Sequence, residues 1–505
     1  MSPSSPITLA ADFLARRRTP LLGIVAGILF VNVIWVTMTY LVYPGYLDHG
    51  EPSVTLISWR LLDGMPAFLG FDDPALTSNI YGPLSYVVHA VSFWLLGPSI
   101  IAGKSASLLA AILIPVLVFL SQRRRGFNQA AVGAILACGL VLFHVPFSIW
   151  NRPDTFLALL GVIAVWAANA SDPHRPEWLK TIVIAVAAGL AVGMKIHAGA
   201  YFAPVVLFHC VNENRGFRTF AAIAVIGLTV VFAPFAFSTF SLSAFVDWIT
   251  MIAKKDSTSV FGSKFVRYGV LYSTPVLFFL ADWRWSGKRL FLAEKVYFWV
   301  FVICLVVILF PATKEGAGTH YFYPFLAIVI DQVLRHAGRL EVRKAGVWGL
   351  VGVLALAILI VGIPVQKRFF RALHWQETAE IQTEIRTIMS DYKGQSIEMG
   401  VGHNVTTYPR TLSRTLLVFA GHPYSLDAAI AMEMIKWKFF LPEKTLSALR
   451  ACKTDLWLIP KGERPFMMTG YYGTPVLPAI FSETFKTRYR KARTYKFFEV
   501  WACTR

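Results

Sequence analysis

The sequence predicts a polytopic α-helical membrane protein with a C-terminal soluble α/β domain. Of its 505 residues, 56% are hydrophobic and only 15% are charged, whereas a soluble globular protein carries about 25% charged residues. Long apolar runs recur, and one crossing of a bilayer needs about 20 such residues, so we expect about 11–13 transmembrane helices. The composition turns polar after Gln366. We therefore divide the chain into a membrane module, residues 1–366, and a soluble domain, residues 367–505.

The net charge of +19 does not indicate nucleic-acid binding. Lys and Arg stand mostly in short clusters between apolar runs, as the positive-inside rule predicts for cytoplasmic loops. Arg16, Arg17 and Arg18 precede the first apolar run, so the N-terminus is expected in the cytoplasm. Anionic lipid headgroups or an anionic substrate are the expected counter-charges.

The first apolar run leads into an outer loop, residues 43–80, that begins with two carboxylates and an imidazole: Asp48, His49 and Glu51. Pro and Gly residues on both sides interrupt any long helix, so this segment is expected to be a shaped loop. Because Asp48 and Glu51 are three residues apart, one helical turn would place them on the same side. Residues 54–69 are moderately apolar and suit a helix lying in the membrane interface.

The stretch between residues 81 and 125 leaves open whether the chain crosses the membrane once or twice there. Two apolar runs, 84–96 and 100–120, precede the cluster Arg123, Arg124 and Arg125. Two full crossings from the outer loop would put this cluster outside, against the positive-inside rule. Either one run is short or re-entrant, or the rule fails here. Beyond this point, alternating charges and apolar runs predict a regular topology.

In that topology one outer face collects many polar residues at helix ends or just inside apolar runs. They are Asp48, His49, Glu51, Arg152, Asp154, Lys195, His197, Lys314 and His320. Charged groups at membrane depth are costly and are candidates for function. Singly, each also has a structural explanation: Arg152 with Asp154 as a pair, Lys195 extending to the headgroups, and each histidine as a satisfied buried ring. Together they predict an outward-facing cavity with acidic and cationic walls.

Transfer of a sugar from a lipid phosphate suits such a cavity. A base must take the proton of the acceptor hydroxyl, and cations must stabilise the departing phosphate. No nucleotide site is needed, and the sequence has neither a P-loop nor a dinucleotide-binding glycine pattern.

Several motifs carry a resemblance to a known family. An apolar helix is followed by the carboxylate loop, then by Tyr81-Gly82-Pro83-Leu84, by Arg152-Pro153-Asp154 between later helices, and by Lys195 beside Gly- and Ala-rich helices. This arrangement, over roughly residues 20–330, resembles the GT-C superfamily of integral membrane glycosyltransferases. That superfamily includes protein O-mannosyltransferases and the lipid A aminoarabinose transferase, which use polyprenyl-phosphate-sugar donors.

The resemblance implies roles for these residues. Asp48 takes the position of the catalytic base in an inverting transfer, and Glu51 assists it or binds a divalent ion together with Asp48 and His49. Arg152, Lys195, His197 and Lys314 are candidates for the donor phosphate. The remaining substrate-binding candidates are His49, Arg60, Tyr81, Asp154, His320 and Tyr321, and Arg60 is also a candidate to keep Asp48 ionised. The sequence reads Asp-His-Gly-Glu where the protein mannosyltransferases have an adjacent Asp-Glu pair, which leaves open which carboxylate is the base and whether the acceptor is a protein.

The predicted function is therefore transfer of a sugar from a polyprenyl-phosphate donor to an envelope glycan, lipid or protein, outside a bacterial plasma membrane. A transporter of lipid-linked glycans is the alternative, although it should show paired halves with interrupted helices, which this sequence lacks. A receptor-like envelope protein would leave the intramembrane polar residues unexplained. The sequence identifies no definite cofactor, and it leaves open whether the site binds a divalent cation.

The soluble domain is expected to have strands at 397–402, 455–460 and 495–503 and a helix at 425–438, an order that suggests a small α/β domain. Cys452 precedes one strand and Cys503 ends another. If those strands lie side by side, the two cysteines come within bridging distance. Cys138, Cys210 and Cys304 fall in apolar runs and are expected in the core.

Overall fold

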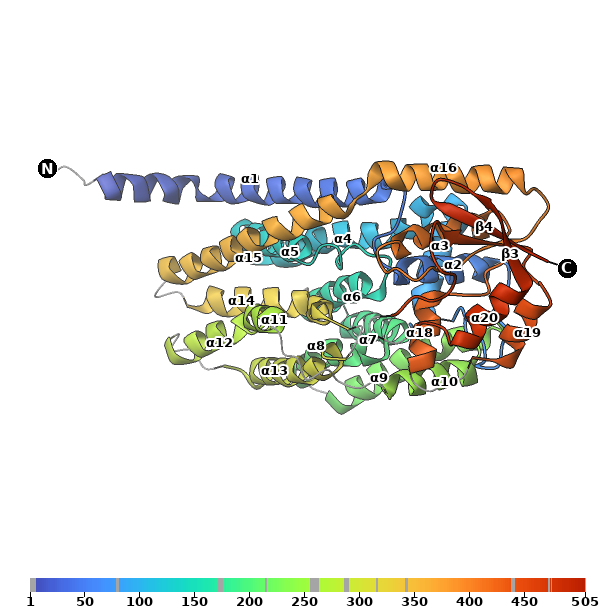
Figure 1. Ribbon diagram of the computed structural model, residues 1–505. Coiled ribbons are helices and arrows are strands. Elements are labelled where there is room, and N and C mark those ends of the chain that lie inside the picture. The colour runs from blue at the N-terminus through green and yellow to red at the C-terminus, as the bar shows by residue number, and fades with distance from the viewer. Residues whose placement is uncertain are drawn as a thin grey trace, which may run out of the picture.

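The computed structural model describes residues 6–78, 81–170, 176–213, 216–254, 263–285, 290–314, 317–340, 344–436, 441–470, 473 and 475–504. It is a long helical bundle with a small sheet domain at one end (Figure 1). The side chains of the Arg16–Arg18 cluster lie outside the described residues.

The bundle is built by fifteen helices in the described part of the chain. Their bounds are α1 Pro6–Val42, α2 Gly50–Leu62, α3 Pro83–Leu96, α4 Ile100–Gln122, α5 Phe127–Phe143, α6 Pro153–Ala168, α7 Glu177–Met194, α8 Gly199–Asn212, α9 Gly216–Phe232, α10 Leu242–Ala253, α11 Ser263–Tyr272, α12 Thr274–Trp285, α13 Leu292–Ala312, α14 Leu326–Arg339 and α15 Lys344–Ala372. Short 3₁₀ turns, Ile196–Ala198 and Thr319–Phe325, precede α8 and α14.

The bundle has the composition of a membrane protein, as the sequence predicted. Among the described residues, six helices are long and apolar enough to cross a bilayer, and five shorter helices of 10–17 residues are also apolar. Large apolar side chains point outward from the bundle, for example Ile303, Val306 and Phe310 of α13, each about 60% exposed. In an aqueous protein such a surface would be costly, and in a bilayer it faces lipid tails. The chain is therefore an integral membrane protein.

The length of helix α3 bears on how often residues 81–125 cross the membrane. It has 14 residues, about 21 Å at 1.5 Å per residue, and this is less than the ~30 Å of a hydrocarbon core. It lies beside α2 at the end of the bundle that carries the sheet domain (Figure 1). The structure thus favours the alternative in which this run is short, so that α4 alone leads from the outer loop to Arg123.

The outer-loop helix differs from the one expected at residues 54–69. Helix α2 begins at Gly50, and its residues from Gly50 to Ser58 are all buried, packed against α3 and the C-terminal helix α17, Arg414–Phe419. Pro52 is tolerated because the first turn of a helix needs no N–H donor there. The helix therefore lies inside protein rather than in the membrane interface.

The C-terminal region is a small α/β unit. Its helices are α16 Trp375–Asp391, α17, α18 Ala428–Lys436, α19 Glu443–Arg450 and α20 Ala479–Arg488, and its strands are β1 Ile397–Met399, β2 Leu456–Pro460, β3 Tyr489–Thr494 and β4 Phe498–Cys503. The strand order is β1-β2-β4-β3, with β1 and β2 parallel and the other pairs antiparallel. The three expected strands and the expected helix are confirmed with shorter bounds. Strand β3 was not predicted because it is an edge strand with five exposed residues.

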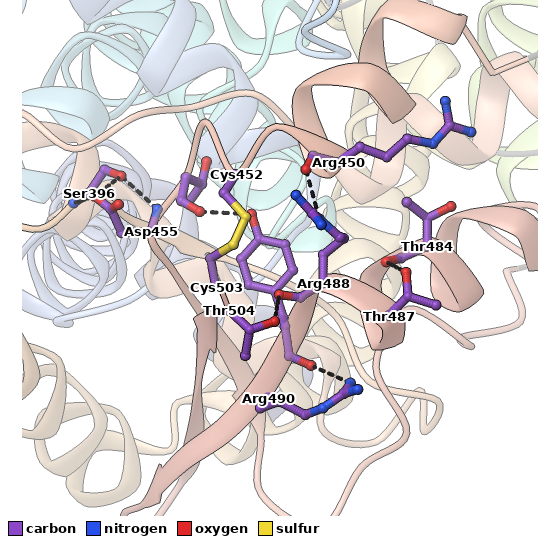
Figure 2. Close-up of a disulfide and its surroundings, with 12 residues drawn as sticks. Ser396, Arg450, Cys452, Asp455, Thr484, Thr487, Arg488, Arg490, Cys503 and Thr504 are labelled. Atoms are coloured by element: carbon purple, nitrogen blue, oxygen red, sulfur yellow. Dashed lines mark hydrogen bonds between the residues drawn. A yellow bond between two sulfur atoms is a disulfide. The ribbon is translucent and has the colours of Figure 1, made fainter.

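The predicted disulfide is confirmed. Strands β2 and β4 are neighbours, and Cys452 is bonded to Cys503 with their Cα atoms 6.0 Å apart (Figure 2). Cys138, Cys210 and Cys304 are free and buried, as expected.

The C-terminal unit shares a hydrophobic core with the outer loop. One cluster of buried residues joins Val54, Phe68 and Leu76 to Trp248 of α10 and to Trp457 of β2. A short backbone ladder adds to this contact: Leu76 N–H donates to the Ser425 carbonyl, and Asp427 N–H donates to the Leu76 carbonyl, at 2.7 and 2.9 Å. The soluble unit and the carboxylate loop are therefore packed as one body.

Candidate active site

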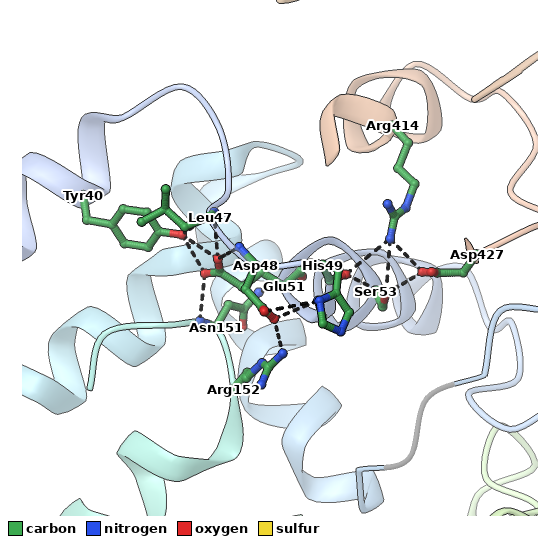
Figure 3. A network of polar contacts seen from close by, with 11 residues as sticks. Tyr40, Leu47, Asp48, His49, Glu51, Ser53, Asn151, Arg152, Arg414 and Asp427 are labelled. Carbon is green, nitrogen blue, oxygen red and sulfur yellow. Dashed lines mark hydrogen bonds and ion pairs between the residues drawn. The ribbon is translucent and has the colours of Figure 1, made fainter. Parts of the chain in front are cut away.

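Asp48 stands just before the first turn of α2, facing a cation from another helix. Its Oδ1 accepts a hydrogen bond from the Gly50 N–H at 2.9 Å and forms an ion pair with the Arg152 guanidinium, and its Oδ2 lies 3.4 Å from His49 Nδ1 (Figure 3). Burial favours the neutral acid, but the Arg152 charge and then that of His49 outweigh it, so the pKa of Asp48 is lowered. Asp48 is therefore held as a carboxylate.

Glu51 has a different environment although it is only three residues away. It is fully buried, and its carboxylate accepts bonds from the Tyr40 hydroxyl at 2.6–2.7 Å and from the N–H groups of Leu47, Asp48 and Asn151, each at 3.1 Å. Burial raises the pKa of Glu51, and the Tyr40 hydrogen bond opposes that rise. With its oxygens turned inward, Glu51 holds the loop that carries Asp48.

Arg152 reaches Asp48 from the start of α6. It has extended backbone angles, as expected for a residue before proline, and Pro153 begins the helix. The guanidinium lies over the Trp150 ring at 4.8 Å, and its Nε has no hydrogen-bond partner among the described groups. The side chain is only 9% exposed, so Arg152 is a buried cation with one hydrogen-bond donor unused among the described groups.

A second ion pair lies between the ends of two helices. Lys195, at the C-terminal end of α7, donates to Asp154, in the first turn of α6, at 2.8 Å. A cation at a helix C-terminus and a carboxylate at a helix N-terminus are both favoured by the helix dipoles. The ammonium also lies 4.1 Å from the centre of the Tyr321 ring.

The backbone around Lys195 is fixed by a contact between two glycines. Gly82 N–H donates to the Met194 carbonyl at 2.9 Å, and Ser85 Oγ donates to the same carbonyl at 3.1 Å. A Cβ on Gly82 would overlap the Gly193 carbonyl oxygen, and a Cβ on Gly193 would lie 2.5 Å from Leu84 Cδ1. Only glycine fits at position 82, whereas a Cβ at position 193 would require the Leu84 side chain to move. This contact places Tyr81 near the ion pairs: burial raises its pKa to about 12, although the charges of Arg152 and Lys195 act to lower it.

Aromatic and imidazole rings border the second ion pair. His197 stacks on Tyr321 at 4.8 Å, and His320 stacks on Phe147 at 5.2 Å. Burial lowers the pKa of His320 to about 3, against the charge of Asp154, so this ring is neutral near pH 7. His197 Nε2 and His320 Nδ1 have no hydrogen-bond partner among the described groups.

Two predicted site residues lie elsewhere. Arg60 is in the last turn of α2, about 15 Å along the helix from its start, and donates to the Tyr424 carbonyl at 3.3 Å. The cation that pairs with Asp48 is therefore Arg152 and not Arg60. Lys314 donates to the Ala253 carbonyl at 3.1 Å and lies near the Phe310 ring. Within the described part of the chain, neither contacts the two ion pairs.

The structure also adds residues that the sequence did not single out. Tyr40 and Asn151 hold Glu51, and the fully buried Lys104 donates to the carbonyls of Tyr40 and Tyr43 at 2.9 and 2.8 Å. A lysine inside the apolar run 100–120 was the available signal. No group of three or more His, Cys, Asp and Glu side chains in the described residues is arranged to hold a metal ion. Asp48, His49 and Glu51 do not converge, because Glu51 faces the backbone of its own loop.

An apolar cavity of about 410 Å³ is lined in part by residues that flank or pack against the polar site. Three of its lining residues are sequence neighbours or ring partners of the polar groups: Leu47 precedes Asp48, the Trp150 ring lies under Arg152, and the Phe147 ring stacks on His320. Phe143, Tyr268, Val365 and Phe369 also line it, and among the described residues Arg368 of α15 is the one cation in its wall. The apolar cavity thus lies next to segments that carry the charged site.

Comparisons with known proteins give a consistent fold. Residues 81–239 match the family model described as dolichyl-phosphate-mannose-protein mannosyltransferase. No curated protein sequence matches the chain.

Solved structures extend the likeness over nearly the whole chain. Two crystal structures of ArnT from Cupriavidus metallidurans, each 14% identical, cover 94% of this chain and 97% of their own. The TM-score is 0.54 for the apo state and 0.57 for the state bound to undecaprenyl phosphate. The Archaeoglobus fulgidus oligosaccharyltransferase complex with Zn and sulfate, 12% identical, covers 86% of this chain and 68% of its own with a TM-score of 0.48. The predicted fold is thereby confirmed, because the chain shares the fold of the ArnT structures over nearly its whole length and residues 81–239 match a mannosyltransferase family model.

Proposed function

We propose that the protein is a membrane glycosyltransferase that moves a sugar from a polyprenyl-phosphate donor to a cell-envelope glycan, lipid or protein. The observation that carries this proposal is that the apolar cavity is lined by Leu47 and Trp150, the first adjacent in sequence to Asp48 and the second packed under Arg152. A donor of this class has an apolar tail, an anionic phosphate and a sugar. The cavity, the cations and the carboxylate supply a matching partner for each part.

The lipid tail would occupy the cavity between α15 and residues 143–150. Its aromatic and aliphatic walls suit an isoprenoid chain, which offers no hydrogen-bonding group. The likeness to ArnT supports this choice, since one of the two ArnT structures is bound to undecaprenyl phosphate. The donor would then enter the cavity from the surrounding membrane lipids.

The donor phosphate would bind Arg152 and Lys195. In the unliganded site each cation is paired with a carboxylate, Asp48 or Asp154. A phosphate arriving between them offers stronger acceptor oxygens, with a charge-assisted bond from each cation. As Arg152 turns to the phosphate, Asp48 loses the charge that lowers its pKa and becomes a stronger base. Donor binding would in this way prepare the base for the next step.

Asp48 would be the base and Glu51 its support. The acceptor hydroxyl gives its proton to Asp48 while its oxygen bonds to the anomeric carbon, and the bond from that carbon to the phosphate oxygen breaks. The electron pair leaves with the polyprenyl phosphate, whose charge Arg152 and Lys195 stabilise. One displacement without a covalent enzyme intermediate inverts the anomeric configuration. Glu51 is the weaker candidate for the base because four donors already occupy its oxygens.

The remaining site residues would contact the sugar or phosphate by hydrogen bonds. His197 and His320 each carry a ring nitrogen without a partner, and Tyr81 and Tyr321 border the cations. His49 lies beside Asp48. The predicted topology puts this end of the bundle, together with the soluble unit, on the extracytoplasmic side of a bacterial plasma membrane.

The test uses purified protein in lipid nanodiscs with radiolabelled polyprenyl-phosphate sugars and isolated bacterial envelope as the acceptor. We expect label to move to the envelope fraction, with inverted anomeric configuration by NMR of the product. The control is the variant Lys444→Met, in which an exposed lysine paired with Asp72 is replaced. It should transfer sugar like the unaltered protein. The same donors binding without any transfer would contradict the proposal.

The alternative function has its own assay. In proteoliposomes, a transporter would move a fluorescent polyprenyl-phosphate lipid between leaflets without changing its headgroup. Headgroup-intact movement, with no sugar transfer, would establish the transporter instead.

A further inference from the structure

A buried ion pair of the C-terminal unit reaches the loop that carries Asp48. Arg414, at the start of α17, is 5% exposed, and Asp427 is fully buried. Arg414 Nη2 lies 2.8 Å from Asp427 Oδ2. The same nitrogen lies 3.3 Å from Ser53 Oγ and 3.5 Å from the His49 carbonyl oxygen (Figure 3). One guanidinium of the soluble unit therefore meets the carbonyl of the residue that follows Asp48.

The acidic partner of this pair is fixed from several directions. Asp427 Oδ2 also accepts from the hydroxyls of Tyr424 and Ser53, its Oδ1 accepts from the Ala429 N–H at 2.9 Å, and its own N–H donates to the Leu76 carbonyl. Because every one of these groups is on the soluble unit or the outer loop, Asp427 sets the position of Arg414 relative to α2.

We propose that Arg414, held by Asp427, is a positioning residue that fixes the start of α2 and thereby the Asp48 carboxylate. The inference rests on the proposed role of Asp48 as base. Glu51 holds the N–H groups of Leu47 and Asp48 from the bundle side, and Arg414 holds the His49 carbonyl from the opposite side. Asp48 is thus clamped between the membrane module and the C-terminal unit, which becomes part of the active site.

The physical cost of the pair agrees with a positioning role. Burying two charges is expensive, and a buried ion pair often adds little net stability compared with apolar residues of the same volume. What such a pair supplies is a defined geometry. A shift of about 1 Å at a reacting group is enough to cost about 100-fold in rate.

The experiment compares Arg414→Lys with Arg410→Lys. Lysine at 414 keeps a positive charge near Asp427, but its shorter side chain does not bring a nitrogen to the position of Nη2, the atom that meets both Asp427 and the His49 carbonyl. Arg410 is the matched control, because it forms a more exposed pair with Glu377 in the same unit. Hydrogen exchange, followed by mass spectrometry on a peptide covering residues 43–55, reports the loop whether or not the protein has transferase activity.

We expect Arg414→Lys to keep the Tm within a few degrees, to speed exchange in peptide 43–55 and to lower kcat about 10- to 100-fold. The KM for the lipid donor and the Kd for undecaprenyl phosphate should stay unchanged. Arg410→Lys should alter none of these. Unchanged exchange in the 43–55 peptide of Arg414→Lys overturns the inference, even if the proposed transferase activity is absent.

Two further results separate positioning from a general structural role. Faster exchange throughout the protein, with kcat and donor affinity falling together, would show that Arg414 only stabilises the fold and would overturn the inference. Asp427→Asn tests the same link from the other side. It should speed exchange in the same peptide, and its kcat should fall with an unchanged KM.

Discussion

Replacement of Asp48 by Asn separates two quantities that the Asp48–Arg152 pair links, the turnover of the donor and its affinity. The Asn side chain has the same size and can still accept from the Gly50 N–H. It cannot take a proton, and it presents no charge to Arg152. The fold should therefore survive while the base and the partner of the cation are both lost.

The two effects have opposite signs. Loss of a general base costs about 10²–10⁴-fold in rate. In the proposed mechanism the donor phosphate competes with Asp48 for Arg152, and a hydrogen bond to a charged group is worth about 1.5–3 kcal/mol. Removing the competitor should tighten binding by at most that amount, which corresponds to a Kd lower by up to about 10- to 150-fold. The same substitution leaves Arg152 without its anion. Without lipid, the free energy of unfolding should therefore fall by about 3 kcal/mol, the lower end of the range for a broken buried ion pair.

The assay measures three properties of the same preparation: turnover of labelled donor, the Kd for undecaprenyl phosphate by titration calorimetry, and the Tm with and without that lipid. We expect low turnover, a lower Kd, and a Tm that falls without lipid but is restored by it. Near-normal turnover in Asp48→Asn, with loss in Glu51→Gln, would exchange the roles of the two carboxylates. Full activity in both variants would refute the proposed chemistry of this loop, and weaker lipid binding in Asp48→Asn would move the phosphate away from Arg152.

Four further predictions test the rest of the site and the fold. Lys195→Met keeps the aliphatic stem and removes the cation, so the Kd for undecaprenyl phosphate should rise by the equivalent of about 1.5–3 kcal/mol, whereas Lys444→Met should bind normally; an unchanged Kd would place the phosphate elsewhere. Arg152→Gln removes the charge that lowers the pKa of Asp48, so that pKa should rise and the acid limb of the kcat/KM profile should move to higher pH; a limb that stays in place would argue against Asp48 as base. In the wild-type protein the lowered pKa of Asp48 stabilises the fold at pH values above the unfolded pKa, and this stability is lost as pH falls through the lower folded pKa. Gly82→Ala should separate α3 from the end of α7, with lower Tm and weaker lipid binding, whereas Gly352→Ala, with open space around it, should be neutral in the same measurements. The double variant Cys452→Ser, Cys503→Ser removes a cross-link between residues 51 positions apart and should destabilise the protein by about 2–4 kcal/mol in denaturant unfolding, while free thiols found in the non-reduced wild-type protein would disprove the bond itself.

Much of the architecture followed from patterns that act locally. Apolar runs, Arg clusters and the change of composition after Gln366 are enough to predict a helical membrane module followed by a soluble unit. The strands around Ile397, Leu456 and Phe498 were predicted from short runs rich in apolar residues. The structure buries most of these residues. Strand β3 was missed because its exposed basic residues obey no apolar alternation.

The ion pairs of the site depended on three-dimensional proximity that no local pattern records. Arg152 and Asp154 are two residues apart and suggested a pair, yet each faces a partner from another segment, Asp48 or Lys195. Arg60 was expected beside Asp48 because it is close in sequence, but α2 carries it toward the C-terminal unit. Arg414 and Asp427 had no signal at all, since their link to the loop at His49 spans more than 360 residues.

The contact between Gly82 and Gly193 bears on how quickly the donor can be captured. The Gly82 backbone packs directly on the Gly193 carbonyl and donates to the Met194 carbonyl, so the peptide that precedes Lys195 is held by the Tyr81–Ser85 turn. The remaining freedom at this position lies in the side-chain torsions of Lys195. Its transfer from Asp154 to a phosphate then needs a change of rotamer and no opening of a loop. Rotamer changes are fast compared with the microsecond-to-millisecond motions of lids, so lipid arrival, rather than rearrangement of the α7 end, would limit the rate at which Lys195 engages its anion.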